Sequence, residues 1–445
     1  MSVMMQAFYW DAPKHENREH EWWNFVAERV EELGKVGFNA LWLPPVSKAA
    51  SNTSMGYDPY DYFDLGDLDQ KGGTKTWYGN RAELEELIAK AHAHGVGLYA
   101  DMVINHNSGA DEEELNPLDG QRRWTKFNPK SGIFARNYNH FHPSRYEQVI
   151  IEGENYAGYP HLCHRNPEVY AAMYRYSRLL IEELGFDGFR FDYVKGFGAW
   201  MIGLLAKYLY VKDGKDFVPY VVGEYWADTE DIDNWLSRVE EFTDNQIAAF
   251  DFPLRYKLKD VCDTPHYDLR NLTDGGSVVM KRPRHAATFV DNHDMGDNAI
   301  VNDKLMAYSF IMVHEGYPCV FWYDYYNNGL ARPGTPNGID ALIQAHHHHA
   351  GGDSQILHAD PDLYIMQRVG WKDESVDQPG LIYVLNNLGD QWSGTSVKTK
   401  WANQKFVPIA WDGHDEAWPD TRTTDADGNA EFPAPPRGYA IYVPA

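Results

Sequence analysis

Cysteine is scarce in this chain, and long apolar runs and a basic leader are missing. The three cysteines among 445 residues, Cys163, Cys262 and Cys319, are widely spaced and odd in number, which argues against a disulfide framework. No apolar run approaches the roughly 20 residues of a membrane-spanning helix. The first residues, Met1–Gln6, show no signal peptide. We therefore expect a protein that stays in the cytoplasm, or one secreted with its targeting segment already removed.

Positive charge is also in deficit. Lys and Arg number 40 against 65 Asp and Glu, which gives a net charge of −25. Such a chain should repel phosphate groups, so we expect neither nucleic acid nor an anionic membrane as a partner. A hydrophobic content of 43% is enough for a large core and excludes a disordered chain. Aromatic residues are abundant, with 15 Trp and 29 Tyr, and rings with a polar tip suit the apolar faces of sugars as well as cores.

Short apolar runs alternate with segments of helical period over the first 354 residues. Helical spacing is clear in Arg81–His94, and a cap at Asn166-Pro167 opens a second helix that Gly185 ends. Eight strand–helix alternations over this length predict an α/β fold of the (β/α)₈ TIM barrel type rather than an open doubly wound sheet. No dinucleotide fingerprint follows any strand, which disfavours the open sheet further. The eight expected strands are Val3–Trp10, Ala40–Val46, Val96–Asn105, Phe186–Asp192, Tyr220–Tyr225, Ala248–Phe252, Ala287–Asp291 and Pro318–Tyr323.

Two segments interrupt or follow this alternation. Residues 107–165, after the third strand, are rich in Asn, Pro, His and Tyr and lack a helical period, so we expect an inserted small domain there. The barrel then comprises residues 1–106 and 166–354. Residues 355–445 alternate short strands with Gly, Asp and Pro turns, which predicts a C-terminal antiparallel β domain. Its clearest strands are expected at Leu363–Val369, Gly380–Asn386 and Ala440–Val443.

Polar residues close four of the predicted barrel strands, in the segments Asp101–His106, Gly188–Lys195, Gly223–Trp226 and Phe289–Asp294. The carboxyl ends of barrel strands converge on one mouth, where catalysis takes place. Two carboxylates there suit glycosidic cleavage, since an ionised one can attack the anomeric carbon while a protonated one releases the leaving oxygen. Each carboxylate taken alone could instead cap a helix or form a salt bridge.

These four segments resemble the four signature regions of the α-amylase family of glycoside hydrolases. The resemblance implies Asp192 as nucleophile, Glu224 as general acid/base and Asp294 as transition-state stabiliser. It also implies substrate-binding roles for five further residues, which are Arg190, His106, His293, Tyr57 and Lys195. Lys195 is followed by Gly196 where many members have His, which is similar to the archaeal and plant enzymes. The activity implied is retaining endo-hydrolysis of α-1,4 bonds in starch, glycogen or maltooligosaccharides by a monomer.

The resemblance also implies metal sites. Asn105 resembles the calcium ligand of the family, with Glu152 a weaker candidate, but His161 occupies the position where an Asp is often found. Calcium is therefore expected at a site that has lost one oxygen ligand. A zinc ion is the second candidate, since His142, Glu147 and Cys163 fall at or near the zinc-binding positions of archaeal α-amylases. The alternative is that these three residues hold no metal.

Other functions remain open from the sequence. A transglycosylase or an oligosaccharide-specific α-glucosidase would use the same carboxylates. A catalytically silent glucan-binding protein is disfavoured because Asp192 and Glu224 are both present, and a metal-dependent barrel hydrolase because His140 and His142 lie outside the first strand. Five tryptophans of the terminal domain are interpreted as packing residues, with a starch-binding platform as the alternative. They are Trp371, Trp392, Trp401, Trp411 and Trp418.

Overall fold

The computed structural model describes residues 2–154, 156, 158–373 and 377–445. Eight parallel strands close into a barrel in the order β1-β14-β13-β12-β11-β8-β5-β2. One of them lies in each expected strand segment to within a residue, so the predicted (β/α)₈ barrel is confirmed, although the first strand is much shorter than expected. The barrel strands are β1 (Met4–Gln6), β2 (Ala40–Leu43), β5 (Gly97–Met102), β8 (Gly188–Phe191), β11 (Tyr220–Gly223), β12 (Ala248–Phe250), β13 (Ala286–Phe289) and β14 (Tyr317–Phe321).

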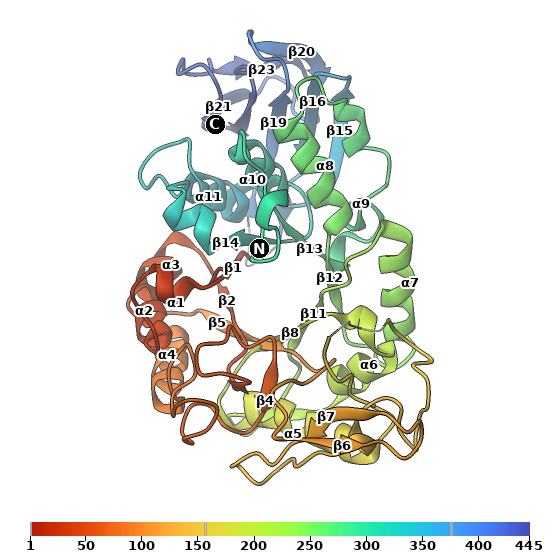
Figure 1. Cartoon of the computed structure of the whole chain (residues 1–445). Coiled ribbons are helices and arrows are strands. Elements are labelled where there is room, and N and C mark those ends of the chain that lie inside the picture. The colour runs from red at the N-terminus through yellow and green to blue at the C-terminus, as the bar shows by residue number, and fades with distance from the viewer. Residues whose placement is uncertain (1, 155, 157, 374–376) are drawn as a thin grey trace.

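Helices surround this barrel (Figure 1). The expected helix at Arg81–His94 is α4, which buries its apolar stripe and begins with a capping box between Asn80 and Glu83. The α-helices are α1 (Ala12–His15), α2 (Trp22–Ala27), α3 (Val30–Val36), α4 (Arg81–Ala93), α5 (Pro167–Arg178), α6 (Ala199–Lys207), α7 (Thr229–Glu240), α8 (Phe252–Asp263), α9 (Val278–Lys281), α10 (Lys304–Val313) and α11 (Ile339–His349). The short helical turns are η1 (Tyr138–His140), η2 (Leu179–Glu183), η3 (Val194–Gly196), η4 (Leu269–Leu272), η5 (Pro283–His285), η6 (Gly296–Asn298) and η7 (Tyr323–Asn327).

The second predicted helix also begins and ends as its sequence indicates. The Asn166 side chain accepts a hydrogen bond from the Glu168 N–H at 2.9 Å and caps α5. The helix continues through η2, and Gly185 follows with φ of 88°, a left-handed conformation that suits glycine at a helix end.

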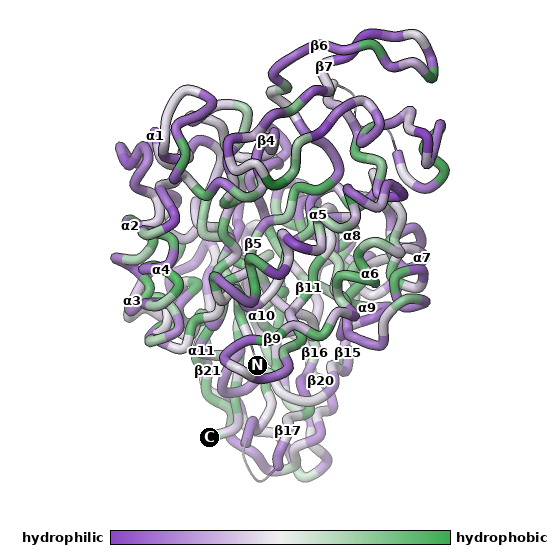
Figure 2. The backbone as a smooth tube through the Cα atoms, turned by 90° about the horizontal axis from the view of Figure 1, so that it is seen from below, coloured by the Kyte–Doolittle hydropathy of each residue, from purple (hydrophilic) through white to green (hydrophobic). Residues whose placement is uncertain are grey.

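The segment between β5 and α5 carries little regular structure beyond η1 and an antiparallel hairpin of β6 (Glu112–Leu115) and β7 (Arg122–Lys126). In both Figure 1 and Figure 2, this hairpin and the C-terminal domain lie at opposite ends of the molecule. Two more short antiparallel strand pairs lie in the segments that connect the barrel strands. They are formed by β3 (Lys48–Ala49) with β4 (Pro59–Asp61), and by β9 (Tyr210–Lys212) with β10 (Lys215–Phe217).

The C-terminal domain is antiparallel, as predicted, and all three expected strands are present. Its main sheet has the order β15-β16-β19-β24-β21-β22, and β20 pairs with β23 around a second apolar core. The strands are β15 (Ser354–Ala359), β16 (Leu363–Arg368), β17 (Trp371–Lys372), β18 (Asp377–Gln378), β19 (Leu381–Asn386), β20 (Ser393–Lys398), β21 (Lys405–Asp412), β22 (Arg422–Thr423), β23 (Asn429–Ala434) and β24 (Gly438–Pro444). Among the described residues, no helix is both long and apolar enough to cross a membrane.

Candidate active site

A buried arginine from β8 forms the centre of the candidate site. Arg190 lies beside Asp101 in the register between β8 and β5. Its Nη1 is 2.9 Å from Asp101 Oδ1 and 2.7 Å from Asp192 Oδ1, and its Nη2 is 2.8 Å from Glu224 Oε1. The predicted partners Arg190, Asp192 and Glu224 therefore come together at the carboxyl ends of β8 and β11, where a charge-assisted guanidinium contact orients each carboxylate.

Asp101 is a site residue that the sequence analysis did not single out. It is fully buried on β5 and accepts hydrogen bonds from the Tyr57 hydroxyl at 2.9 Å and from the Trp42 indole at 3.0 Å. Burial raises the pKa of Asp101 to about 7, although Arg190 opposes the shift. The sequence did contain a sign of this role. Asp101 begins the strand-end segment Asp101–His106, and the period-two alternation of a strand places its side chain on the same face as that of Asn105.

Glu224 has the environment of a proton donor. It follows β11, is almost fully buried, and accepts a hydrogen bond from the Tyr193 N–H at 3.0 Å. Burial raises its pKa well above the ordinary value; Arg190 opposes this, and the charges of Asp192 and Asp294 add to it. Burial of this kind favours the protonated form of a carboxyl group, which is the form that can donate a proton.

Aromatic rings line the wall beside Asp294. His293 Nε2 is 3.3 Å from Asp294 Oδ2, and the His293 ring stacks on that of Tyr57 with centroids 4.9 Å apart. Burial lowers the pKa of His293 well below its ordinary value, so the imidazole is neutral. Trp10, an exposed residue beyond β1, lies nearly parallel to both rings. The sequence analysis placed Trp10 at the end of the first barrel strand, whereas β1 ends at Gln6 and Trp10 lies beyond it, exposed beside these two rings.

His106, at the end of the barrel portion before the inserted segment, carries a second group of rings. His106 contacts the Tyr57 carbonyl oxygen through Nε2 at 2.8 Å, and the rings of Tyr156 and Tyr159 stack on its imidazole with centroids 4.7 and 5.1 Å away. Lys195, in η3, lies farther out. Among the described residues its ion-pair partner is Glu154, at 3.4 Å, and not a strand-end carboxylate.

A cavity of about 620 Å³ continues from the rings beside His106 over the inserted segment. Tyr156 and Tyr159 line it on the side of His106, and Trp124 of β7 lines it farther out with 59% of its surface exposed. An open cavity with aromatic walls beside the carboxylates has the shape and chemistry for a long polyhydroxylated chain.

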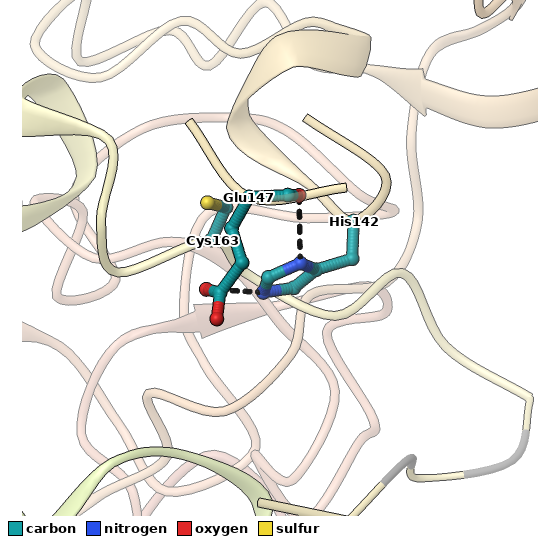
Figure 3. A group of neighbouring side chains, drawn as sticks. All are labelled: His142, Glu147 and Cys163. Atoms are coloured by element: carbon teal, nitrogen blue, oxygen red, sulfur yellow. Dashed lines mark hydrogen bonds and ion pairs between the residues drawn. The ribbon is translucent and has the colours of Figure 1, made fainter. Parts of the chain in front are cut away.

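The three residues predicted to bind zinc form one group of donors (Figure 3). One ligand atom from each of His142, Glu147 and Cys163 lies within 4.8 Å of the others. His142 Nδ1 lies 3.3 Å from the Glu147 carbonyl oxygen. If Nδ1–H donates a hydrogen bond to that oxygen, Nε2 carries a free lone pair, which is available to a metal ion and lies 3.7 Å from the Glu147 carboxylate. Imidazole, carboxylate and thiol together fit the preferences of zinc.

The residues predicted to bind calcium fit their ion only in part. The Oδ1 atom of Asn105 is buried and has no hydrogen-bond donor among the described residues, as expected of an oxygen reserved for a cation. The Glu152 carboxylate is half exposed and lies 3.3 Å from Arg165. Both ring nitrogens of buried His161 are unpartnered within the described part of the chain, and burial lowers its pKa to about 4. A neutral imidazole is a poor substitute for a hard oxygen ligand.

An eight-stranded barrel with clustered carboxylates at its mouth and an aromatic groove beside them defines the class of barrel glycoside hydrolases. Comparison with known proteins agrees. Residues 19–208 match the family model described as alpha amylase, catalytic domain, and residues 381–443 match that described as alpha-amylase C-terminal. The glucan 1,4-alpha-maltohexaosidase of Bacillus sp. (strain 707) is 31% identical over 414 residues, which cover 79% of this chain and 76% of that protein.

Two further matches extend over nearly the whole chain. The alpha-amylase of Geobacillus stearothermophilus is 29% identical over 506 aligned residues, covering 99% of this chain and 87% of that enzyme. The crystal structure of alpha-amylase from Geobacillus thermoleovorans, complexed with acarbose, has the same fold with a TM-score of 0.68 at 19% identity, over 95% of this chain and 92% of that one. The chain belongs to the alpha-amylase family and is a glycoside hydrolase, which confirms the resemblance noted in its sequence.

Proposed function

We propose that this protein is an α-amylase that hydrolyses internal α-1,4-glucosidic bonds of starch-like glucans with retention of configuration, acting as a monomer. The observation that carries the proposal is the contact of one buried guanidinium with two carboxyl groups, Arg190 with Asp192 and Glu224. Retaining glycosidases require one ionised and one protonated carboxyl group on the two sides of the scissile bond.

The first chemical step assigns a different role to each group. The Asp192 carboxylate attacks the anomeric carbon, and the bond from that carbon to the glycosidic oxygen breaks as the Glu224 proton moves to the leaving oxygen. The product is a glycosyl ester on Asp192. The geometry supports this division of roles, because the Arg190 guanidinium holds the Asp192 carboxylate at 2.7 Å, while burial of Glu224 raises its pKa and favours its protonated form.

The second step reverses the roles. Glu224, now ionised, removes a proton from water, and the resulting hydroxyl attacks the same anomeric carbon and displaces Asp192. Asp294 and the neutral His293 lie next to each other and are assigned to the sugar hydroxyls, together with His106, which contacts the Tyr57 backbone. The Tyr57 ring, held through its hydroxyl by Asp101, offers a stacking face for the cleaved sugar.

The groove over the inserted segment supports a polymeric substrate rather than a disaccharide. Its volume of about 620 Å³ and its exposed Trp124 provide room and a stacking face beyond the catalytic carboxylates. A transglycosylase or an oligosaccharide-specific α-glucosidase remains the second candidate, because the same carboxylates serve both reactions. Incubation with soluble starch, with and without an acceptor sugar, separates these activities through the chain lengths and anomeric configuration of the early products.

Metal binding is a further part of the proposal. A zinc ion would be held by His142, Glu147 and Cys163, and a calcium ion by Asn105 with Glu152. Bound there, the ions would supply cross-links within the inserted segment and between that segment and the end of β5, and no chemical step depends on them. The support is the convergence of three donors at the first site and the unpartnered Asn105 oxygen at the second.

A further inference from the structure

A second cleft, remote in sequence from the catalytic carboxylates, lies between the barrel and the C-terminal domain. One wall is the loop after η7, with Arg332, Pro336 and Asn337, and the other is the segment from Trp411 to Trp418 that leaves β21. Its volume is about 540 Å³. None of the catalytic residues proposed above lines it, so its chemistry needs an explanation of its own.

Trp418 is the most conspicuous residue of this cleft. Its surface is 69% exposed, whereas Trp411 beneath it is only 5% exposed. The two rings make an edge contact with centroids 4.1 Å apart, so the inner indole supports the outer one. A single exposed apolar side chain is common on protein surfaces, but one that is braced by a buried ring at the side of a cavity provides a prepared stacking face.

The polar groups of the cleft are held in place before any ligand arrives. Arg332 Nη1 donates to Asp412 Oδ1 at 2.9 Å and to the Asn337 carbonyl oxygen at 2.8 Å. Asp415 accepts hydrogen bonds from the Trp392 indole at 2.7 Å and from the Ala417 N–H at 2.9 Å. Because these side chains are already ordered, a ligand that binds them avoids much of the entropy cost of fixing them.

The composition of the lining indicates the class of ligand. Three carboxylates, Asp412, Asp415 and Glu416, accompany a single arginine, so the cleft repels anions such as phosphates. Carboxylate oxygens accept hydrogen bonds from hydroxyl groups, and an indole face stacks on the apolar face of a sugar ring. A neutral, polyhydroxylated chain satisfies both requirements.

We propose that this cleft is an accessory binding site for an α-glucan chain, in which Trp418 stacks on one sugar ring and the surrounding carboxylates accept its hydroxyl protons. The inference rests on the proposed function for the identity of the glucan. The site retains the enzyme on a polymer or granule while the barrel mouth cleaves.

The position of the cleft suits this role. A neighbouring cavity of about 590 Å³ shares Arg332 and Asp412 with it and extends to Asp291 and Tyr323, which follow β13 and β14 at the carboxyl edge of the barrel. A chain held at Trp418 therefore lies next to a second hollow that reaches the carboxyl ends of β13 and β14.

The test compares two exposed tryptophans of the same domain. Trp418→Ala removes the proposed stacking face, and Trp371→Ala is the matched control, because Trp371 is 56% exposed but does not line the cleft. Adsorption to starch granules and retardation in gels that contain amylopectin are measured for both variants. We expect about tenfold weaker binding for Trp418→Ala and binding within about twofold of wild type for Trp371→Ala. Hydrolysis of a short chromogenic maltooligosaccharide should be unchanged in both.

A second variant tests the cleft without removing an indole, so that local unfolding around Trp411 cannot account for the result. Glu416→Lys keeps both indoles and places a cation in the cleft, and it should also weaken granule adsorption while the melting temperature stays at the wild-type value. Wild-type adsorption by both Trp418→Ala and Glu416→Lys overturns the accessory site, as does an equal loss in Trp371→Ala. Failure of the proposed function is a separate result, in which the wild-type protein does not cleave the short substrate or starch at all.

Discussion

Arg190 and Glu224 form an ion pair of 2.8 Å although burial favours the protonated form of Glu224. The same guanidinium contacts Asp192 at 2.7 Å and Asp101 at 2.9 Å. One cation therefore contacts three carboxyl groups. It cannot balance three negative charges, which favours protonation of a carboxyl group in this cluster. Burial and the charges of Asp192 and Asp294 raise the pKa of Glu224, and the proposed first step uses the proton that this shift favours.

Replacement of Asp192 by Asn should abolish catalysis without unfolding the protein. The amide has the same shape but is no nucleophile, so kcat on soluble starch should fall by at least about 10³-fold. The melting temperature should change by only a few degrees, and an Asp420→Asn variant, altered at an exposed position, serves as the control. Turnover near the wild-type rate in Asp192→Asn would contradict the assignment of the nucleophile.

Replacement of Arg190 by Lys should reduce both activity and stability, because a point charge cannot contact three carboxyl groups as a planar guanidinium does. We expect kcat to fall by about 10²-fold or more and the free energy of unfolding to fall by about 3 kcal/mol, the cost of leaving buried carboxylates unpaired. Steady-state kinetics and urea denaturation measure the two effects. If both values stay at wild type, the central role given to Arg190 is wrong.

The raised pKa of Glu224 predicts a pH-dependent gain in stability for Glu224→Gln. The folded protein binds this proton more tightly than the unfolded chain does, in which the pKa of Glu is about 4.3. The wild-type protein therefore loses stability as the pH rises from about 4 through the folded-state pKa, and the neutral Gln variant does not share this loss.

Denaturant unfolding of both proteins at pH 4, 6 and 8 tests this expectation. The variant should match wild type at pH 4 and become progressively more stable than wild type toward pH 8, while its activity is lost at every pH. A stability difference between the two proteins that stays constant with pH would show that Glu224 holds no extra proton in the folded state.

Trp124→Ala should affect long substrates more than short ones. The side chain lies in the groove beyond the catalytic carboxylates, so KM for amylopectin should rise by about three- to tenfold while kinetics on a maltotriose-sized chromogenic substrate are unchanged. Leu115→Ala is the matched control, because Leu115 is 52% exposed on the same hairpin and does not line the groove. Equal kinetics of the two variants on both substrates would remove the groove from the substrate-binding site.

Chelation tests the proposed metal sites. Treatment with EDTA should release zinc and calcium in about equimolar amounts, measured by elemental analysis, and should lower the melting temperature because the ions stabilise only the folded state. Cys163→Ser should lose zinc alone, and Asn105→Ala should lose calcium alone. A protein that contains neither metal as purified, and whose melting temperature EDTA leaves unchanged, would refute both sites.

The periodicity of the sequence determined the barrel and the identity of the residues at its mouth. Short apolar runs alternate with helical segments, and the carboxyl ends of barrel strands meet at one mouth, so the sequence predicted that Asp192, Glu224 and Asp294 lie there together. The catalytic roles given to them came from the resemblance to the α-amylase family. The start of α5 was also predictable from the sequence, because the Asn166 side chain accepts a hydrogen bond from the Glu168 N–H and Pro167 occupies the first helical position.

Tertiary structure alone decided how residues from distant segments meet. The support of Asp101 for Arg190 depends on the register between β5 and β8. The alignment of Trp10 with His293 depends on closure of the barrel by β1 and β14. Sequence reasoning assigned five tryptophans of the terminal domain to packing, which is right for Trp411 and wrong for Trp418 and Trp371. A periodic pattern reports the direction of a side chain from its own element, but exposure depends on which other element covers that face, and this is a property of the folded chain.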